Sequence, residues 1–359
     1  MRRTVLPALM AGAALTAGSC GGATSDAKTP PLRQMPSSST LGEQQPRSGE
    51  AKEPITIAFA GDTHFHAQLA RRLASPRMAL GPTIPELKRA DFTMVNLETA
   101  ITTRGREEPK KYNFRAPASA FSALKAAGID VVSMANNHGV DYGQVGLRDS
   151  LAAIKKSGYP VVGIGRNAAE AYKPYYATVK GTRLAVIGAT QVLDDNLIAG
   201  WTATGSQGGL ASAKNAPRLV HEVRKARSRA DAVIVYLHWG QEMRACPLPR
   251  QKVLAAQLVK AGADVIIGGH AHVPLGGGFM QGRYVDYGMG NFLFYAASGR
   301  TADSGILEVT LRGRKVLKAQ WKPATISGGV PRLLAGASRQ QALAKWNGLR
   351  RCTGLDATR

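Results

Sequence analysis

The sequence feature that most restricts the fold is a set of five apolar runs, each followed directly by polar side chains. The runs are rich in Val, Ile and Ala, and their length suits buried β-strands. The carboxyl ends of parallel strands lie at one edge of a sheet, where α/β proteins bind their ligands. We therefore expect the polar residues to meet at one rim. The runs span residues 55–60, 92–95, 130–135, 232–237 and 263–267.

Six of the seven histidines follow these runs, and the exception is His221 in an amphipathic basic segment. His270 and His272 leave the last run through Gly268 and Gly269. Successive side chains of an extended strand face opposite ways, whereas on a turn two imidazoles can converge on one ion. An isolated His-x-His also occurs by chance on solvated loops. The argument for a metal therefore depends on the other runs.

The five runs together supply Asp, Glu, Asn and His, with no thiolate among them. This set is typical of sites for hard to borderline divalent cations. We therefore predict a metal site at the common rim. The polar residues that the runs deliver to it are Asp62 and His64 after the first run, Glu98 after the second, Asn137 and His138 after the third, and His238, His270 and His272 after the last two. His66, which also follows the first run, is expected either to lie behind the ligands or to be exposed.

Residues 1–19 have the features of an export signal. A charged start precedes an apolar stretch from Val5 to Ala17 that is too short for a stable membrane-spanning helix. The small residues before Cys20 resemble a bacterial lipoprotein cleavage site, with Cys20 as the acylated first residue. Ala17 departs from that pattern, since such sites usually carry Leu, Val or Ile there, and ordinary secretion is the alternative. The paired arginines Arg2 and Arg3 loosely resemble a twin-arginine signal.

The rest of the chain divides into three parts. Residues 20–53 are rich in Ser, Thr, Pro, Gln and Gly, so we predict a disordered tether. Residues 54–325 alternate strand-like and helix-like segments before ending in hairpin-like strands, which predicts one α/β domain of two packed mixed sheets flanked by helices. Residues 326–359 are expected to form a helical tail. The predicted helices span 83–90, 119–127, 146–156, 218–226, 251–260 and 340–351.

The chain is strongly basic. Its 47 Lys and Arg outnumber 24 Asp and Glu, for a formal net charge of +23. Such a charge favours anionic surfaces such as phospholipid, cell-wall polyanions or another acidic polymer. The basic residues are scattered and no aromatic stacking platform accompanies them, so we do not expect nucleic acid as a partner.

Three cysteines occur, Cys20, Cys246 and Cys352. If Cys20 carries a lipid, the other two remain as an even pair in an oxidising compartment, which favours a disulfide that fastens the C-terminal tail near the His238 loop. Two unpaired thiols are the alternative. A metal-ligand role for Cys246 is disfavoured because the neighbouring motifs supply only nitrogen and oxygen.

The order of these motifs resembles the calcineurin-like metallophosphoesterases, and their detail resembles one branch, the CapA family, named for poly-γ-glutamate capsule synthesis. The resemblance covers residues 55–323. Many CapA-like chains lack a histidine at the position of His64, two residues after Asp62. Members of the family commonly carry a His-Pro insertion near Gly269–His272, and this chain lacks it. The matching motifs are Gly61-Asp62, Asn96-Leu97-Glu98, Asn136-Asn137-His138 with Asp141 and Gly143, His238-Trp239-Gly240-Gln241-Glu242, and Gly290-Asn291-Phe292.

The resemblance implies two divalent metal ions, Mn, Fe or Zn, and a role for each motif residue. It implies that Asp62, His64 and His272 hold one ion, that Asn137, His238 and His270 hold the other, and that Glu98 bridges them. His138 would protonate a leaving group. Asp141 would orient His138, although a turn-forming role is the alternative, and Arg115 would pair with an anionic substrate unless it is one surface arginine among many. Trp239 is expected to pack, and Glu242 and Asn291 to support the loop and the rim.

Two functions fit this resemblance. In the first, the protein is a hydrolase that uses an activated water on a phosphoester, or on an amide such as a γ-glutamyl bond. In the second, it is a non-catalytic partner of membrane polymer-synthase subunits and helps make or hold an anionic surface polymer. A metal-assisted epimerase is a third option. The complete set of predicted ligands together with His138 favours the hydrolase, because a binding protein has no use for a proton donor.

Overall fold

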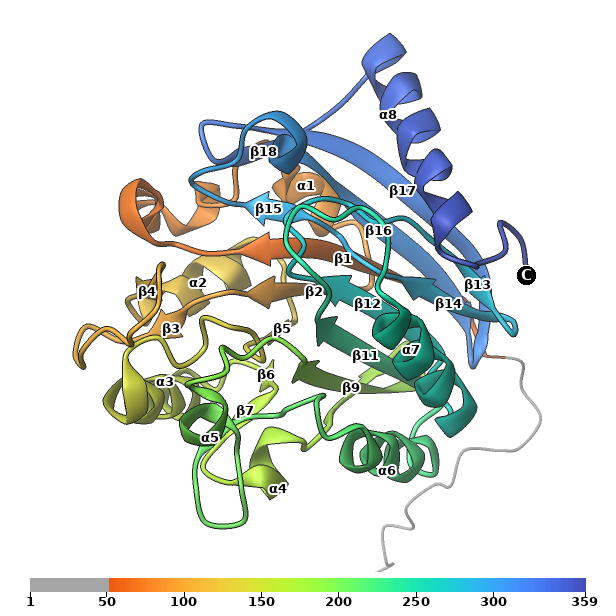
Figure 1. Ribbon diagram of the computed structural model, residues 1–359. Coiled ribbons are helices and arrows are strands. Elements are labelled where there is room, and N and C mark those ends of the chain that lie inside the picture. Colours follow the sequence, from red (N-terminus) through yellow and green to blue (C-terminus); the bar gives the residue numbers. More distant parts are fainter. Residues whose placement is uncertain (1–51) are drawn as a thin grey trace, which may run out of the picture. The chain divides into compact units, whose positions relative to one another are not determined.

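A computed structural model describes residues 52–359 (Figure 1). The predicted export signal 1–19, the lipidation site Cys20 and nearly all of the predicted tether 20–53 lie outside the described residues. Among the residues that are described, no helix is both long and apolar enough to cross a bilayer.

The first sheet has eight strands in the order β18-β17-β16-β1-β2-β5-β6, with β15 also paired to β1. The pairs β1–β2, β2–β5 and β5–β6 are parallel, and β16, β17 and β18 add antiparallel neighbours. The strands are β1 (Ile55–Thr63), β2 (Phe92–Leu97), β5 (Val131–Ser133), β6 (Val161–Val162), β15 (Asn291–Leu293), β16 (Asp303–Arg312), β17 (Lys315–Ser327) and β18 (Val330–Leu333).

The second sheet has six strands in the order β13-β14-β12-β11-β9-β8. Its central strands β9, β11, β12 and β14 run parallel to one another, and β8 and β13 add antiparallel edge strands. The strands are β8 (Tyr175–Val179), β9 (Thr182–Thr190), β11 (Ala232–His238), β12 (Val265–Gly269), β13 (Gly277–Met280) and β14 (Arg283–Asp286). Two small sheets pair β3 (Ala100–Ile101) with β4 (Arg115–Ala116) and β7 (Ile164–Gly165) with β10 (Gly209–Leu210).

Alternation along the strands produces the layers. In β11, Ile234 and Tyr236 join a core shared with β1 residues of the first sheet, such as Phe59, whereas Val233 and Val235 join a core with helices α6 and α7. The outer face of the first sheet packs in the same way against α2 and α3. Because both faces of each sheet are covered, the strands are apolar on both sides. The predicted fold class, two packed mixed sheets flanked by helices, is thereby confirmed.

The helices follow the predicted pattern with local differences. They are α1 (Ile84–Leu87), α2 (Ser119–Ala126), α3 (Gly143–Ser157), α4 (Ala168–Ala171), α5 (Ile198–Trp201), α6 (Ala216–Arg227), α7 (Pro249–Ala261) and α8 (Gly336–Leu349). The helix predicted over 83–90 shortens to α1, which has Pro85 in its first turn and ends at Leu87, because the chain then turns so that the Asp91 N–H donates to the Thr56 carbonyl of β1 at 2.9 Å. The domain boundary predicted at 325 falls inside β17, and β18 continues the sheet beyond it, so the tail becomes helical only at Gly336.

Cys246 and Cys352 are joined by a disulfide that links the loop after β11 to the short 3-10 helix η5 (Arg350–Cys352). The bridge closes a loop with a sequence separation of 106 residues. Replacing both cysteines by alanine is expected to lower the free energy of unfolding by about 2–5 kcal/mol, because the unfolded chain regains loop entropy. Urea unfolding measures this loss. Peptide mapping without reductant that finds both thiols alkylated would contradict the disulfide.

Asp286, at the end of β14, is a fully buried carboxyl with few partners. Its Oδ1 accepts a hydrogen bond from the Gly288 N–H at 2.9 Å, and its Oδ2 has no hydrogen-bond partner among residues 52–359. Burial raises the pKa of Asp286 from its ordinary value of 3.8 to about 7. The folded protein thus keeps a proton that the unfolded chain releases near pH 4, and this group lowers stability progressively as the pH rises to about 7.

Asp286→Asn removes this pH dependence. We expect the stability of the variant relative to wild type to rise by about 4 kcal/mol between pH 4 and pH 7 and to stay level above pH 7. Chemical denaturation at several pH values measures the difference. A difference that does not change between pH 4 and pH 8 would show that Asp286 does not hold its proton in the folded protein.

Candidate metal centre

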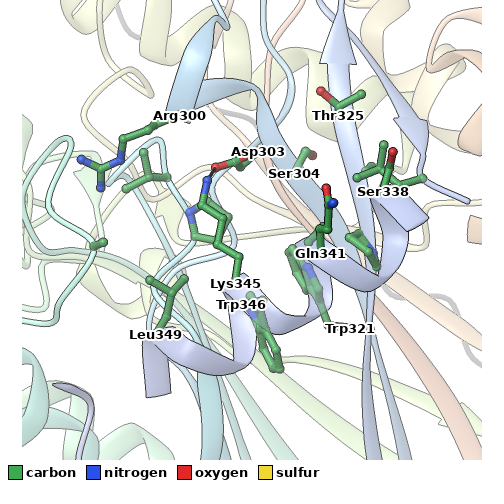
Figure 2. A pocket seen from close by; sticks show the side chains of 17 residues that line it. Arg300, Asp303, Ser304, Trp321, Thr325, Ser338, Gln341, Lys345, Trp346 and Leu349 are labelled. Carbon is green, nitrogen blue, oxygen red and sulfur yellow. Dashed lines mark hydrogen bonds and ion pairs between the residues drawn. The ribbon is translucent and has the colours of Figure 1, made fainter. Parts of the chain in front are cut away.

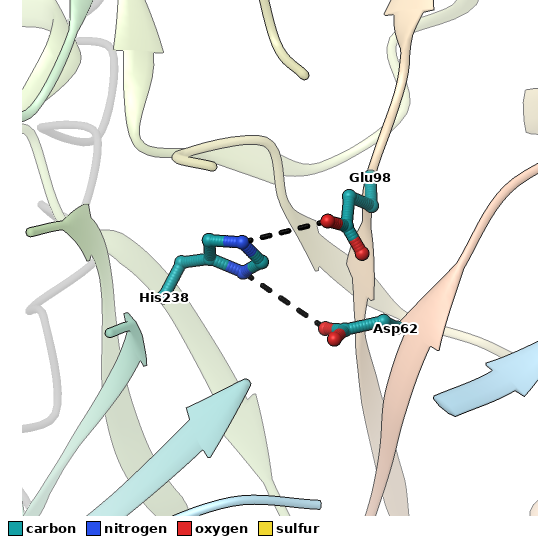
Figure 3. Close-up of side chains that lie close together, drawn as sticks. All are labelled: Asp62, Glu98 and His238. Carbon is teal, nitrogen blue, oxygen red and sulfur yellow. Dashed lines mark ion pairs between the residues drawn. The ribbon is translucent and has the colours of Figure 1, made fainter. Parts of the chain in front are cut away.

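Three fully buried side chains from both sheets meet at one point (Figure 3). Asp62 lies near the end of β1, Glu98 directly follows β2, and His238 ends β11. Each offers one ligand atom, and these atoms lie within 4.8 Å of one another. His238 lies between the carboxylates, with Nε2 3.5 Å from Glu98 Oε1 and Nδ1 3.9 Å from Asp62 Oδ1. The three residues therefore form a group that can hold a metal ion.

Backbone pairing aligns the residues of each rim, and a glycine lets the two rims approach closely. In the first sheet Asp62 is in register with Asn96, and the Glu98 N–H donates to the Thr63 carbonyl at 2.8 Å. In the second sheet His238 is in register with Gly269. A Cβ at Gly269 would lie 2.6 Å from Asp62 Oδ1, so only glycine allows this close approach.

The electrostatics of the centre favour a cation. Both carboxylate oxygens of Glu98 lack a hydrogen-bond partner among the described residues. Burial is the largest cause that raises the pKa of Glu98 well above its usual range, and the negative charge of Asp62 is the second. Burial likewise raises the pKa of Asp62, although His272 and the hydrogen bond from Asn96 oppose it. A buried carboxylate without donors is costly unless a positive charge compensates it, and a bound metal ion provides that charge.

Two imidazoles of the centre are in the protonation state that ligates metals. Burial lowers the pKa of His238 and of His270 well below the usual value, and neighbouring histidines lower it further. Both rings are therefore neutral at pH 7, and a neutral ring nitrogen is the atom that coordinates a metal. The Nδ1 atom of His270 has no hydrogen-bond partner among residues 52–359. The residues present thus fit a divalent metal ion.

The turn after β12 carries two of the predicted histidine ligands, and both have an unusual backbone conformation. His270 has φ 92° and His272 has φ 56°, a region that side-chain-bearing residues seldom adopt. The His270 N–H donates to Asp62 Oδ2 at 3.0 Å, and His272 Nδ1 lies 3.6 Å from the same oxygen. His272 Nδ1 also lies 2.8 Å from Asn291 Oδ1, which agrees with a supporting role for Asn291. Such backbone strain is concentrated at functional sites.

Asn137 also reaches the centre, whereas His64 does not join it. Asn137 Oδ1 lies 2.7 Å from His238 Nε2. His64 Nδ1 instead accepts a hydrogen bond from the His66 N–H at 3.1 Å, and the ring packs against Phe114 and Phe294. The other ring nitrogen of His64, Nε2, accepts from the Tyr295 N–H at 3.4 Å. The role of His64 as a ligand remains a prediction.

A second group of residues surrounds His138. Its Nδ1 lies 2.5 Å from Asp141 Oδ2, and its Nε2 lies 3.9 Å from Glu98 Oε1. Phe114 stacks on the imidazole at 3.9 Å between ring centroids. Asp141 is fully buried and also accepts from the Phe114 N–H and, at 2.9 Å, from Lys110 Nζ. Asp141 therefore holds the ring so that Nε2 faces the carboxylate centre.

Sequence reasoning did not assign roles to three residues of the site. Asn96 Nδ2 donates to Asp62 Oδ1 at 2.8 Å, and Asn136 Nδ2 donates to Asn96 Oδ1 at 3.0 Å, so two amides orient the Asp62 carboxylate. Lys110, with a side chain only 8% exposed, donates to the Asn137 carbonyl as well as to Asp141. The asparagines belong to the quoted motifs, whereas no local pattern distinguishes Lys110 from other lysines.

The remaining predicted residues lie at the margin. Arg115 is exposed on β4, with its guanidinium 4.8 Å from the centre of the Tyr142 ring, and no short contact joins it to the centre among the described residues. Trp239 is fully buried and donates to the Tyr287 carbonyl at 3.0 Å, as expected for a packing residue. Glu242 is exposed.

Comparison with known proteins gives matches in sequence and in structure. Residues 56–296 match the model of the family described as bacterial capsule synthesis protein PGA_cap. Capsule biosynthesis protein CapA of Bacillus anthracis is 33% identical over 261 residues, which are 70% of this chain and 62% of that protein. PGA biosynthesis protein CapA of Bacillus subtilis strain 168 is 30% identical over 258 residues, 69% of this chain and 64% of that protein. The chain thus matches less than two thirds of either relative.

A solved hypothetical protein from Thermus thermophilus is 15% identical and overlaps 76% of this chain and 100% of that chain, with a TM-score of 0.48.

Proposed function

Since this chain belongs to the PGA_cap family of bacterial capsule synthesis proteins, we propose that it is a metal-dependent hydrolase in the metabolism of an anionic surface polymer. Its substrate would be a phosphoester or a γ-glutamyl amide. The single observation that carries the proposal is Glu98, whose fully buried carboxylate has no donor to either oxygen among the described residues and lies between His238 and His138.

The ions would be held by the side chains that converge on Glu98. These are Asp62, Asn137, His238, His270 and His272, with His64 as a further ligand implied by the resemblance. When bound, two divalent ions lower the pKa of a shared water and neutralise charge that develops on the attacking and leaving oxygens. The amides of Asn96 and Asn136 keep Asp62 in one orientation, as outer-shell partners of a metal ligand do.

His138 would supply the proton for the leaving group. Asp141 fixes its Nδ1, and Phe114 covers one face of the ring, so Nε2 is the nitrogen left to act. Burial lowers the pKa of His138 to about 4, an effect that Asp141 opposes. An anionic substrate beside Nε2 would favour the imidazolium by charge attraction. Protonation of His138 would thereby accompany substrate binding.

The experiment that tests the proposal compares two substrates. Purified wild-type protein, expressed with Mn²⁺ and Fe²⁺ supplied, is assayed with a generic aryl phosphate and with γ-linked glutamate oligomers, and its metal content is measured. Hydrolysis of either substrate that disappears on chelation and returns with metal supports the hydrolase. Protein that holds metal and cleaves neither substrate would contradict it.

That second result would favour the other candidate, a non-catalytic partner in making or retaining an anionic polymer. The formal net charge of +23 is the observation that supports this alternative. Such a protein would bind a polyanion with a strong dependence on salt, because the attraction between exposed charges is screened. It would work together with membrane subunits of a polymer synthase.

We also propose that Cys20 carries a lipid that anchors the protein to the outer face of the cell membrane. The support is the small-residue site before Cys20 in the sequence. Wild type is expected to fractionate with membranes, and Cys20→Ala to be released or retained unprocessed. Wild-type protein found free in the medium, in the same amount as Cys20→Ala, would contradict the anchor.

A further inference from the structure

Helix α8 is attached to the protein through the buried Trp346, the partly buried Leu343 and Leu349, and a disulfide that follows the helix. The helix lies along β17 (Figure 1), and among its residues only Trp346 is buried. Trp346 stacks parallel to Trp321 of β17, with 5.4 Å between ring centroids and 4° between ring planes. Directly after α8, Cys352 is bonded to Cys246. The C-terminal end of α8 is thus fixed, while the rest of the helix makes few buried contacts.

A cavity of about 370 Å³ lies between α8 and the strands β16 and β17 (Figure 2). Its size falls within the range of small-molecule sites, roughly 300–1,000 Å³. The lining is largely apolar, with Val273, Pro274, Ala324, Ala342 and Leu349 beside the two tryptophans. Apolar walls of this kind favour a ligand with a hydrocarbon or aromatic body.

Charged side chains stand at one side of this cavity (Figure 2). Lys345 Nζ pairs with Asp303 Oδ2 at 2.6 Å, and their side chains are 59% and 41% exposed. Arg300 also lines the cavity and forms no ion pair with another residue of the described chain. Lys345 is paired with Asp303, and Arg300 adds a second cation at this side of the cavity, so the excess charge there is positive. This excess would attract an anionic group.

We propose that the cavity under α8 binds a small anionic amphiphile, a molecule with one carboxylate and a short apolar body. The apolar body lies against Trp321 and Ala342, where it leaves water, and the carboxylate lies near Lys345 and Arg300. The site is separate from the metal centre in its residues, and it does not depend on the proposed hydrolase activity.

Calorimetric titration of the disulfide-bonded full chain with simple alkyl compounds tests the site. Octanoate is expected to bind roughly 15-fold more tightly than hexanoate, because each added methylene that leaves water strengthens binding about fourfold. Octylamine, which has the same apolar body and a positive charge, is expected to bind much more weakly. Absence of octanoate binding, or equal affinity for octanoate and octylamine, would overturn the proposal.

Matched variants of α8 locate the binding. Ala342→Phe fills the cavity and is expected to weaken octanoate binding at least tenfold, whereas Ala344→Phe adds the same group to an exposed position outside the lining and should leave the affinity unchanged. Ser338→Phe is a second filling variant, in case Ala342→Phe does not fold. Equal octanoate affinities of a folded filling variant and of Ala344→Phe would refute this location.

Charge variants test the carboxylate end. The double variant Arg300→Met/Lys345→Met is expected to bind octanoate about tenfold more weakly, since each exposed ion pair contributes at most a fewfold gain. The control Lys315→Met/Lys318→Met makes the same change of charge on β17 outside the lining. An equal loss in both double variants would mean that overall charge, rather than this cavity, attracts the anion, and would contradict the proposal.

Discussion

Replacing Glu98 by glutamine is expected to lower the affinity for divalent metal ions by at least about 100-fold, since even the loss of an outer-shell partner costs up to that much. The change keeps the shape of the side chain and removes the charge of a carboxylate that no donor in the described chain compensates. The metal-free variant is also expected to unfold at a higher temperature than metal-free wild type, because glutamine does not carry the free-energy cost that burial imposes on this acid and that its raised pKa reflects.

Elemental analysis and titration with Mn²⁺ measure the first effect, and calorimetry of chelated protein measures the second. Glu53→Gln is the control, because it makes the same substitution at an exposed position before β1, at the opposite end of that strand from Asp62. His238→Ala should also lose metal. If Glu98→Gln holds as much metal as wild type, a metal centre at this rim is contradicted. It is also contradicted if wild type takes up no Mn²⁺, Fe²⁺ or Zn²⁺.

Replacing His138 by alanine is expected to leave the metal content unchanged and to slow hydrolysis by about 10²–10⁴-fold, the usual contribution of a positioned proton donor. The expectation rests on the position of the ring, which is bound to Asp141 through Nδ1 and has Nε2 3.9 Å from Glu98 Oε1. His138 is therefore next to the centre without being needed to complete its ligand set.

Turnover of the better of the two substrates and metal content are measured on the same preparation. His221→Ala on α6 is the control, because it removes an imidazole that lies in a different part of the fold. A His138→Ala variant that loses its metal would make His138 a ligand or a structural support. A variant that keeps both metal and full turnover would remove His138 from the mechanism.

Local patterns in the sequence were sufficient for the strands and for the position of the rim. The β11 run predicts a strand because Val and Ile fill it, and both of its faces are covered by apolar layers. Its last residue, His238, is carried to the sheet edge by the strand itself, as are Asp62 in β1 and Gly269 before His270 in β12. An error occurred where a tertiary contact overrides a local pattern: the predicted helix 83–90 ends at Leu87, before Asp91 pairs with Thr56 of β1.

The sequence by itself thus determined the two-sheet architecture and the residue types at the rim, because strand periodicity and chain order are local properties. The tertiary structure alone decided which polar atoms pair. It placed Lys110 on Asp141, joined Asn136 and Asn96 to Asp62, and left Glu98 without a donor in the described chain. These contacts join residues far apart in the chain, and their geometry depends on how β1, β2, β5 and the loops that follow them lie beside one another. Periodicity predicts which face a residue occupies, but it does not predict which partner that residue meets there.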